Sequence, residues 1–278
     1  MVVLFECTSN QIVRRGDYAD MQAASATLPE GAYTTFRTYH RSRVLRLEHH
    51  AVRLRESVAL MGGSAQLTDE AVRAAVREAL SRTGYEESRL RLTLPGSGDG
   101  AAGRLFVSIE PFTPYPEALF QSGAACITDA LRRDNPHAKS TAFIASAGRA
   151  YQALPPGVHE GLMAAEDGAV LEGYSSSFFA VLDGALHTEQ ARALVGVTQS
   201  IVLELARQAW PDLPVVAAAV HLADLPRASE CFITSVSREV LPVTRIDGQP
   251  VGEGRPGPVS LRLLAAYRAL VEREARPV

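Results

Sequence analysis

One residue stands out by its type. Lys139 is the single lysine of the chain, whose other 27 Lys and Arg residues are all arginine. An amine can lose its proton and form a Schiff base with an aldehyde, whereas a guanidinium stays charged. Arginine can fulfil the ordinary functions of a surface cation, such as solubility or a weak ion pair, equally well. The lone lysine is therefore a candidate for covalent chemistry, and the alternative is a solvated surface residue.

Three other patterns lack an essential part of the catalytic motif that each suggests. PGSGDG at 95–100 has no Lys-Ser/Thr pair and so is not a P-loop. GYSSS at 173–177 does not match the nucleophile pattern GxSxG. His49 and His50 lack the HExxH spacing of a zinc helix. We therefore expect neither a nucleophilic serine nor a metal site.

The candidate lysine must be positioned by helices and strands, and the first half of the chain reads as α/β. Apolar residues at helical spacing, a threonine N-cap and β-branched runs predict these elements. They are strands at Gly31–Tyr39, Arg43–Leu47 (paired with the first across a short turn), Leu90–Leu94 and Leu105–Ile109, and helices at Leu47–Met61 and Thr68–Gly84.

The second half is richer in short strands, and DGAV and DGAL are hairpin-turn signals. Predicted strands are Ala124–Thr128, His159–Ala165, Ala169–Leu171, Phe178–Leu182, Val215–Val220 and Cys231–Ser235; predicted helices are Ser140–Leu154, Gln199–Trp210 and Val259–Glu272. The mixture indicates a barrel-like, curved sheet with helices outside. The Pro-rich segment 111–117 is the best linker, so we expect an α+β chain with domains at 1–116 and 117–278.

Composition excludes several classes of protein. A net charge of -3 gives no support for nucleic-acid or anionic-membrane binding. The chain has neither a run of eighteen apolar residues nor a signal-peptide pattern at its start. Its three cysteines, Cys7, Cys126 and Cys231, are widely spaced without CxxC, which fits a reducing compartment. We expect a cytoplasmic protein without a membrane span.

Five pieces occur in a recognisable order from about Gly31 to Tyr267. They are GAYTTFRTY followed by HHAVRL, then PHAKSTAF, GLMAAEDGAVLEGYSSSFF, ALVGVTQ, and ECFITSVSREVLPV with IDGQPVGEGRPGP. This series closely resembles the fold type IV enzymes that use pyridoxal 5'-phosphate (PLP): branched-chain and D-amino-acid aminotransferases and aminodeoxychorismate lyase. The resemblance implies a small N-terminal α/β domain carrying an arginine that binds the cofactor's phosphate. It implies a larger pseudo-barrel domain carrying the Schiff-base lysine.

The resemblance assigns roles to individual residues. Lys139 matches the family lysine, Arg53 of His50-x-x-Arg53-Leu54 matches the phosphate-binding arginine, and Glu172 matches the glutamate that pairs with the pyridine nitrogen. Further contacts to the cofactor come from two loops. The residues of these loops are Val197 and Thr198, and Ser235, Val236 and Ser237.

Substrate contacts are predicted at Tyr33, Thr35 and Arg91, although Arg91 also reads as a strand-surface cation. Tyr33 and Phe36 must lie on opposite faces of their strand, and we prefer Tyr33 for the side-chain pocket, which favours an apolar or aromatic substrate. The chain departs from the family pattern at four positions. These are Thr34 where many aminotransferases have glutamate, Pro95 where D-amino-acid enzymes have arginine, Ser177 for asparagine and Val236 for threonine.

The leading hypothesis is an aminotransferase that moves an amino group between an amino acid and a 2-oxo acid, with Lys139 moving the proton. The Thr34-Thr35 run keeps 4-amino-4-deoxychorismate lyase open as an alternative. The losses at Ser177 and Val236 keep open a cofactor-binding protein without activity. The resemblance also predicts a homodimer.

Overall fold

The computed structural model describes residues 1–8, 11–96 and 103–278, so most of the predicted turn at 95–103 lies outside the described residues. Contacts within the chain define two compact units. Unit 1 comprises 1–113, 137–148 and 271–278, and unit 2 comprises 114–136 and 149–270. The segment 137–148, which carries Lys139, thus groups with the N-terminal part of the chain. The domain boundary at 116/117 stays a prediction from sequence.

Unit 1 is built on a five-stranded antiparallel sheet with the order β2-β1-β6-β5-β3. Its strands are β1 (Val2–Cys7), β2 (Ile12–Tyr18), β3 (Gly31–Arg37), β5 (Ser88–Pro95) and β6 (Leu105–Pro111). Alternate residues of β5 are buried leucines, as expected for a strand that packs one face on helices. The sequence predicted β3, β5 and β6 but missed β1 and β2.

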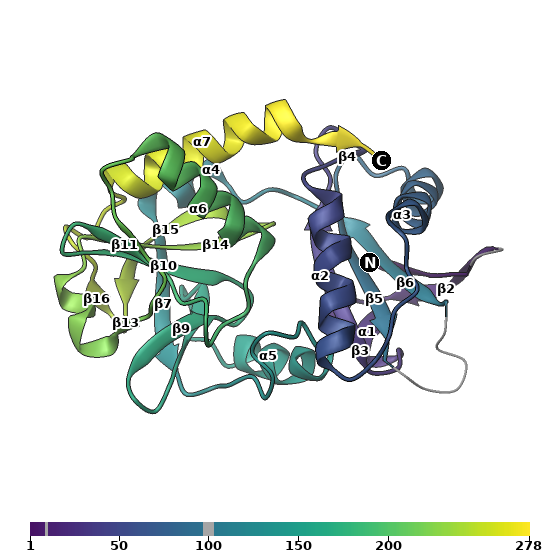
Figure 1. Cartoon of the computed structure of the whole chain (residues 1–278), viewed down its shortest axis with the longest axis horizontal. Helices are drawn as coiled ribbons and strands as arrows, with labels where there is room; N and C mark the ends of the chain where they lie inside the picture. The colour runs from purple at the N-terminus through teal and green to yellow at the C-terminus, as the bar shows by residue number, and fades with distance from the viewer. Residues whose placement is uncertain (9–10, 97–102) are drawn as a thin grey trace. The chain divides into compact units, whose positions relative to one another are not determined.

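Helices cover both faces of this sheet. The helices of unit 1 are α1 (Met21–Ala26), α2 (Leu47–Leu60) and α3 (Asp69–Thr83). The predicted cap of α3 is confirmed, because the Thr68 side chain accepts a hydrogen bond from Ala71 N and Gly84 ends the helix at φ +66°. Helix α2 contacts β3 and β5, where Figure 1 shows it alongside the sheet, while α1 covers the opposite face.

One predicted pairing in unit 1 is wrong. Strand β4 is only Arg43–Val44, and it pairs with β17 (Arg276–Pro277) near the C-terminus. A single bridge between Tyr39 and Arg43 remains of the predicted hairpin. The physical reason lies in Arg46, which adopts a left-handed conformation at φ +52° and starts helix α2 at Leu47. The alternating residues 43–47 therefore cannot continue as a strand.

Unit 2 contains a ten-stranded sheet. Nine strands follow the order β12-β11-β10-β14-β15-β7-β8-β9-β13, and β16 pairs with β15. Pairs β15–β7, β7–β8 and β11–β12 are parallel, and the others are antiparallel. The strands are β7 (Ala124–Asp129), β8 (Glu160–Ala164), β9 (Ala169–Gly173), β10 (Ser177–Leu182), β11 (Ala185–His187), β12 (Val215–Val216), β13 (Val220–His221), β14 (Glu230–Ser235), β15 (Glu239–Ile246) and β16 (Gln249–Pro250).

The predicted helices of the second half are present with small changes in their ends. They are α5 (Ala142–Gln152), α6 (Val197–Ala209) and α7 (Pro258–Glu274), joined by a short α4 (Glu117–Ser122) and the 3₁₀ helix η1 (Leu222–Arg227). The predicted strand 215–220 is wrong as one element, because it forms two short strands in different parts of the sheet. Strand β15 was missed, since Pro242 lies in its middle and proline normally signals the absence of a strand.

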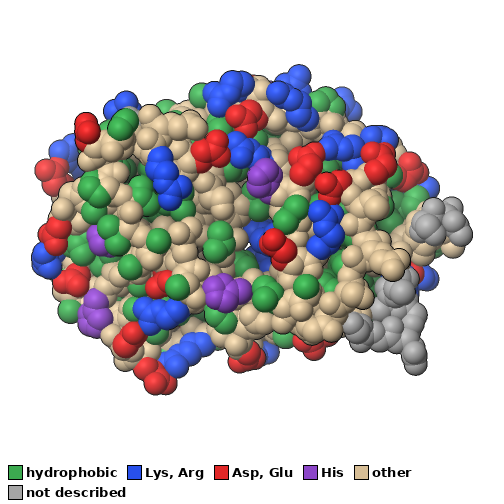
Figure 2. Space-filling model, in the orientation of Figure 1, with side chains coloured by type: hydrophobic (Ala, Val, Ile, Leu, Met, Phe, Trp, Pro, Cys, Tyr) green, Lys and Arg blue, Asp and Glu red, His purple; other side chains and the backbone are tan. Residues whose placement is uncertain are grey.

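Two features of the described residues concern the classes of protein considered above, membrane-spanning proteins and proteins that bind nucleic acid. Among the described residues, no helix is long and apolar enough to cross a membrane. On the face drawn in Figure 2, basic and acidic side chains alternate rather than gather by sign. Exposed ion pairs also occur among the described residues, such as Arg227 with Asp183.

Candidate active site

The backbone of Lys139 is held from two sides within unit 1. Its N–H donates to Ser57 Oγ of helix α2 at 3.1 Å, and its carbonyl accepts from Tyr33 N of β3 at 2.8 Å. The residues after it extend the sheet, with a bridge between Ala32 and Ser140. Lys139 is therefore not a solvated surface cation, because its segment is joined to the edge of the sheet.

The Lys139 amine lies over an aromatic ring. Its Nζ is 4.7 Å from the ring centroid of Tyr33, a cation–π distance. Tyr33 is buried, and the Arg91 guanidinium lies 5.0 Å from the same ring centroid. Phe36 lies on the other face, with its ring against His50 of α2. The structure thus confirms the predicted alternation and groups Tyr33 with the lysine.

The contacts of Arg91 decide against one of the two interpretations of this residue. It is not a strand-surface cation, because its Nη1 donates to Met21 O at 3.1 Å and to Ser25 Oγ at 2.6 Å, both in α1. Thr35 pairs with Arg91 across the strands, so it faces the same side as Tyr33. Burial lowers the pKa of the Arg91 guanidinium below its ordinary value. The three predicted substrate residues therefore share one face of the sheet.

This face also holds polar atoms that lack partners. Arg91 Nε, Thr93 Oγ1 and Ser108 Oγ are buried and have no hydrogen-bond partner among the described residues. Ser108 pairs directly with Arg91, and Thr93 follows two residues along β5. Buried polar groups are normally satisfied by protein, water or ligand. The side of the sheet that carries Tyr33 therefore also holds buried polar groups on the face that α1 covers.

Arg53 lies on the opposite face, where α2 covers β3. Its Nη2 donates to Thr34 Oγ1 at 2.7 Å, and Thr34 Oγ1 is 2.9 Å from His50 Nδ1. Burial lowers the pKa of His50 well below its ordinary value, and the charges of Arg53, His49 and Lys139 act in the same direction. His50 is therefore neutral. Arg53 and His50 lie three residues apart on one face of the helix.

Glu172 of unit 2 is a buried carboxylate with a fixed cation. Its Oε1 accepts from Arg133 Nε at 2.9 Å and from Leu194 N at 3.4 Å, and the side chains of Arg133 and Glu172 are only 4% and 5% exposed. Arg133 also donates from Nη2 to Tyr174 O at 3.3 Å. A carboxylate held by a guanidinium in this way is ionised and fixed in orientation.

The start of helix α6 lies in the same part of unit 2. Its first residues Val197 and Thr198 are buried, and Gly196 precedes them. A Cβ on Gly196 would lie 2.9 Å from the Ser177 hydroxyl oxygen, so a larger residue here would require the Ser177 side chain to move. Because the first N–H groups of a helix have no acceptor within it, this terminus can bind an anion.

The second predicted loop is the hairpin turn between β14 and β15. Ser235 ends β14, and Val236 and Ser237 follow in the turn, all three half-buried. Ser235 Oγ accepts a hydrogen bond from Arg238 N at 3.2 Å. Thr234, the residue before them, pairs with Ser177 across β10 and β14. Unit 2 thus brings the β14–β15 turn to the same sheet position as Ser177 and the α6 terminus.

A buried ionic network that the sequence analysis missed supports these loops. Arg238 lies 3.2 Å from Glu160 and donates to Ser175 Oγ at 2.9 Å, and Tyr151 donates to Glu160 at 2.5 Å. Burial raises the pKa of the Tyr151 phenol, so the hydroxyl stays protonated. The network joins the β14–β15 turn to the loop that follows Glu172. No local sequence pattern links residues that lie this far apart along the chain.

Breaking this pair should destabilise the fold. Arg238→Met leaves Glu160, which is fully buried, without its cation, and we expect the free energy of unfolding to fall by about 3–5 kcal/mol. The double variant Arg238→Met with Glu160→Leu should recover most of this loss, because two apolar side chains replace the pair. Urea unfolding of both variants measures this, and a single variant as stable as the parent would contradict it.

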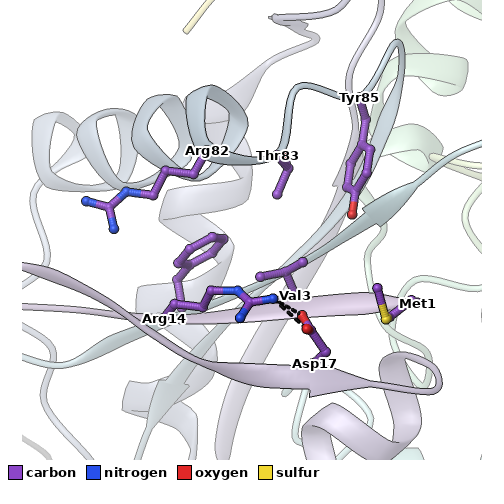
Figure 3. Close-up of a pocket in the computed structure, with 8 residues that line it drawn as sticks. Met1, Val3, Arg14, Asp17, Arg82, Thr83 and Tyr85 are labelled. Atoms are coloured by element: carbon purple, nitrogen blue, oxygen red, sulfur yellow. Dashed lines mark hydrogen bonds and ion pairs between the residues drawn. The ribbon is translucent and has the colours of Figure 1, made fainter.

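Two surface pockets of unit 1 lie away from the predicted residues. The pocket drawn in Figure 3 has a volume of about 270 Å³ and is lined by Met1, Val3, Phe5, Arg14, Asp17, Arg82, Thr83 and Tyr85. Arg14 points toward Asp17 in this view and forms an ion pair with it. A second pocket of about 120 Å³ lies by Arg46 and Glu274, which are also paired. Their charges are satisfied locally, so neither pocket is a strong candidate for chemistry.

Comparison with known proteins places the chain in a family. The model of the family described as amino-transferase class IV matches residues 31–246. A branched-chain-amino-acid aminotransferase of Pseudomonas aeruginosa is 29% identical over 243 residues, covering 82% of this chain and 78% of that protein. A D-alanine aminotransferase of Bacillus licheniformis is 28% identical over 280 residues, covering 96% of each.

Solved structures show the same fold. The T.th. branched-chain amino acid aminotransferase with pyridoxamine 5'-phosphate matches with a TM-score of 0.82 at 24% identity, covering 99% of this chain and 95% of that one. The Escherichia coli branched-chain amino acid aminotransferase matches with a TM-score of 0.79 at 22% identity, covering 99% and 96%.

The chain is therefore an enzyme of the aminotransferase type with the α+β architecture of fold type IV. It belongs to the class IV aminotransferase family.

Proposed function

We propose that this enzyme uses PLP to transfer an amino group from an apolar or aromatic amino acid to a 2-oxo acid. One observation carries the proposal most directly. The only amine side chain, Lys139, is held through its backbone by Ser57 of the helix that also carries Arg53. The amine that can bind a carbonyl carbon is thus hydrogen-bonded through its backbone to α2, and α2 itself carries the cation that can bind phosphate. A phosphorylated aldehyde needs both groups.

Each unit contains groups that suit PLP. In unit 1, Lys139 would bind the aldehyde carbon and Arg53 the phosphate, since a guanidinium suits phosphate oxygens. In unit 2, the amides of Val197 and Thr198 and the turn Ser235–Val236–Ser237 are the proposed phosphate donors, and the ionised Glu172 would pair with the pyridine nitrogen. The first amides of α6, which follow Gly196, lack an acceptor within the helix, and this suits a phosphate.

Bound PLP supplies an electron sink for the carbanion that forms at the substrate Cα. The chain's own residues do the rest. Lys139 Nζ, over the Tyr33 ring, holds and moves the proton that leaves Cα. Arg133 keeps Glu172 ionised and oriented. Tyr33 lines the side-chain pocket, and Thr35 and Arg91 share its side of the sheet.

The amino donor is tested by incubating the PLP-loaded protein with single L- and D-amino acids and 2-oxoglutarate. We expect keto acids from apolar or aromatic donors, because Tyr33 forms an aromatic wall. We expect D-amino acids to be poor donors, because Pro95 replaces the arginine of the D-amino-acid enzymes. Product formation is measured by mass spectrometry, with the protein omitted as control.

Two outcomes would contradict this proposal. Release of pyruvate from aminodeoxychorismate, without any keto acid from the amino-acid panel, would assign the lyase reaction suggested by Thr34-Thr35. The imine absorbance of the bound cofactor without turnover of either substrate class would assign a binding protein without activity. The homodimer and the cytoplasmic location stay predictions, for which sedimentation and cell fractionation are the measurements.

A further inference from the structure

Thr34 lies where a strand and a helix of unit 1 meet around Arg53. It is fully buried on β3, and its hydroxyl contacts two side chains of α2. Arg53 Nη2 is 2.7 Å away and His50 Nδ1 is 2.9 Å away. Because this hydroxyl bridges a cation and an imidazole, the direction of each hydrogen bond matters here.

The guanidinium fixes one of these directions, and the other follows for the His50 tautomer whose Nδ1 carries no proton. A guanidinium only donates, so Thr34 Oγ1 accepts from Arg53. The hydroxyl proton then points to an acceptor, and Nδ1 of a neutral imidazole is one. Burial and the neighbouring positive charges keep His50 neutral. The chain of donors therefore runs from Arg53 through Thr34 to His50, with each bond polarising the next.

We propose that Thr34 is a positioning residue that orients the Arg53 guanidinium for the phosphate group of the cofactor, with neutral His50 as its terminal acceptor. This inference rests on the proposed role of Arg53. The contact uses one of the five N–H donors of the guanidinium and thereby sets the plane in which the others lie. Planar orientation matters because an arginine binds phosphate through two parallel N–H groups.

The same residue explains why Arg53 needs support from the sheet. Arg53 is only half-buried, and a long side chain on a helix surface samples many rotamers. Thr34 is on β3, two residues from the strand position that binds the Lys139 segment. A single strand thus positions both the phosphate cation and the lysine backbone, so the spacing between them depends on the sheet rather than on flexible loops.

The test compares how PLP and pyridoxal bind to the full-length apoenzyme. Both aldehydes can bond to Lys139, but only PLP carries a phosphate, so the dissociation constant of pyridoxal divided by that of PLP isolates the phosphate contacts. In Thr34→Val, which keeps the shape but loses the hydroxyl, we expect PLP binding to weaken by about 10-fold. Pyridoxal binding should change by less than about twofold. Thr34→Ser, which retains the hydroxyl, should restore the parent ratio.

Two further variants make the result interpretable. Arg53→Gln should reduce the ratio at least as much as Thr34→Val. Thr38→Val is the matched control, because Thr38 is also a buried threonine near the end of this strand and its hydroxyl accepts from Ser88 N at 2.8 Å instead. Its ratio should equal that of the parent. A general loss of folded protein weakens the binding of both aldehydes equally and leaves the ratio unchanged.

The outcomes separate this inference from the proposed function. If Arg53→Gln lowers the ratio but Thr34→Val does not, the positioning role of Thr34 is wrong while the phosphate site stands. If neither variant changes the ratio, Arg53 does not bind the phosphate, and both this inference and the proposed role of Arg53 are overturned, while amino transfer is tested separately by keto-acid formation. If Thr38→Val lowers the ratio as much as Thr34→Val, the effect is a general one of the strand and the inference also fails.

Discussion

Replacing Lys139 with alanine is expected to lower kcat/KM for amino transfer by at least about 10³-fold, because the variant loses the covalent anchor and the proton carrier together. The structure removes the obvious substitute. Since the chain has one lysine, the variant retains no side-chain amine at all. Arginine cannot replace it, because a guanidinium does not lose its proton, so Lys139→Arg should be equally inactive.

The uniqueness of this lysine makes the measurement unusually clean. Borohydride reduction of the PLP-loaded parent, followed by peptide mapping, should label Lys139 and no other side chain. Added methylamine or ethylamine should restore part of the proton transfer in Lys139→Ala but not in Lys139→Arg, where the larger side chain fills the space. Label on the N-terminal amine alone, or undiminished turnover in Lys139→Ala, would overturn the assignment.

Replacing Glu172 with glutamine is expected to have the second large effect. We expect kcat to fall by about 10²–10³-fold, because a neutral amide no longer keeps the pyridine nitrogen protonated. The free energy of unfolding should also fall by about 3 kcal/mol, since Arg133 loses its buried counter-charge. A loss of stability alone does not distinguish catalysis from packing, so the variant needs a control with the same structural cost.

Glu160→Gln provides that control. Glu160 is also a buried carboxylate of unit 2 that faces an arginine, Arg238, and its side chain is fully buried. Its neutral variant should lose comparable stability in urea while kcat falls far less than in Glu172→Gln. Measurements at a temperature where both variants are folded separate the two effects. Equal kcat values for the two variants would show that Glu172 acts through packing rather than on the cofactor.

Much of the fold could be predicted from sequence because the signals are local. The Thr68 cap and the Gly84 terminator fixed helix α3, since each acts within one turn of the helix. The predicted strands that became β3 and β10 are runs of β-branched or aromatic residues, and β5 alternates leucine with other residues; neither pattern needs a partner to be recognised. Strand β15 was missed because Pro242 interrupts its pattern, and β1 was missed although its residues Val2–Phe5 are apolar and β-branched or aromatic in part.

The candidate site divides in the same way. Chemical type identified Lys139 as the only side-chain amine of the chain, and this property does not depend on tertiary contacts. Arg53 was singled out by its place in the motif His50-x-x-Arg53-Leu54, and thus by resemblance. The role of Glu172 and the two loops came from resemblance in order along the chain, and their cofactor contacts stay predictions.

Only the tertiary structure decided which groups support these residues. Ser57 holds the Lys139 backbone, Thr34 holds Arg53, and Arg133 holds Glu172. Arg91 turned inward to α1, against the statistical preference of arginine for the surface. Each of these contacts joins residues that are far apart in sequence or on different elements. One-dimensional patterns carry no information about such pairs, because the free energy of a buried hydrogen bond depends on where its partner lies after the chain has packed.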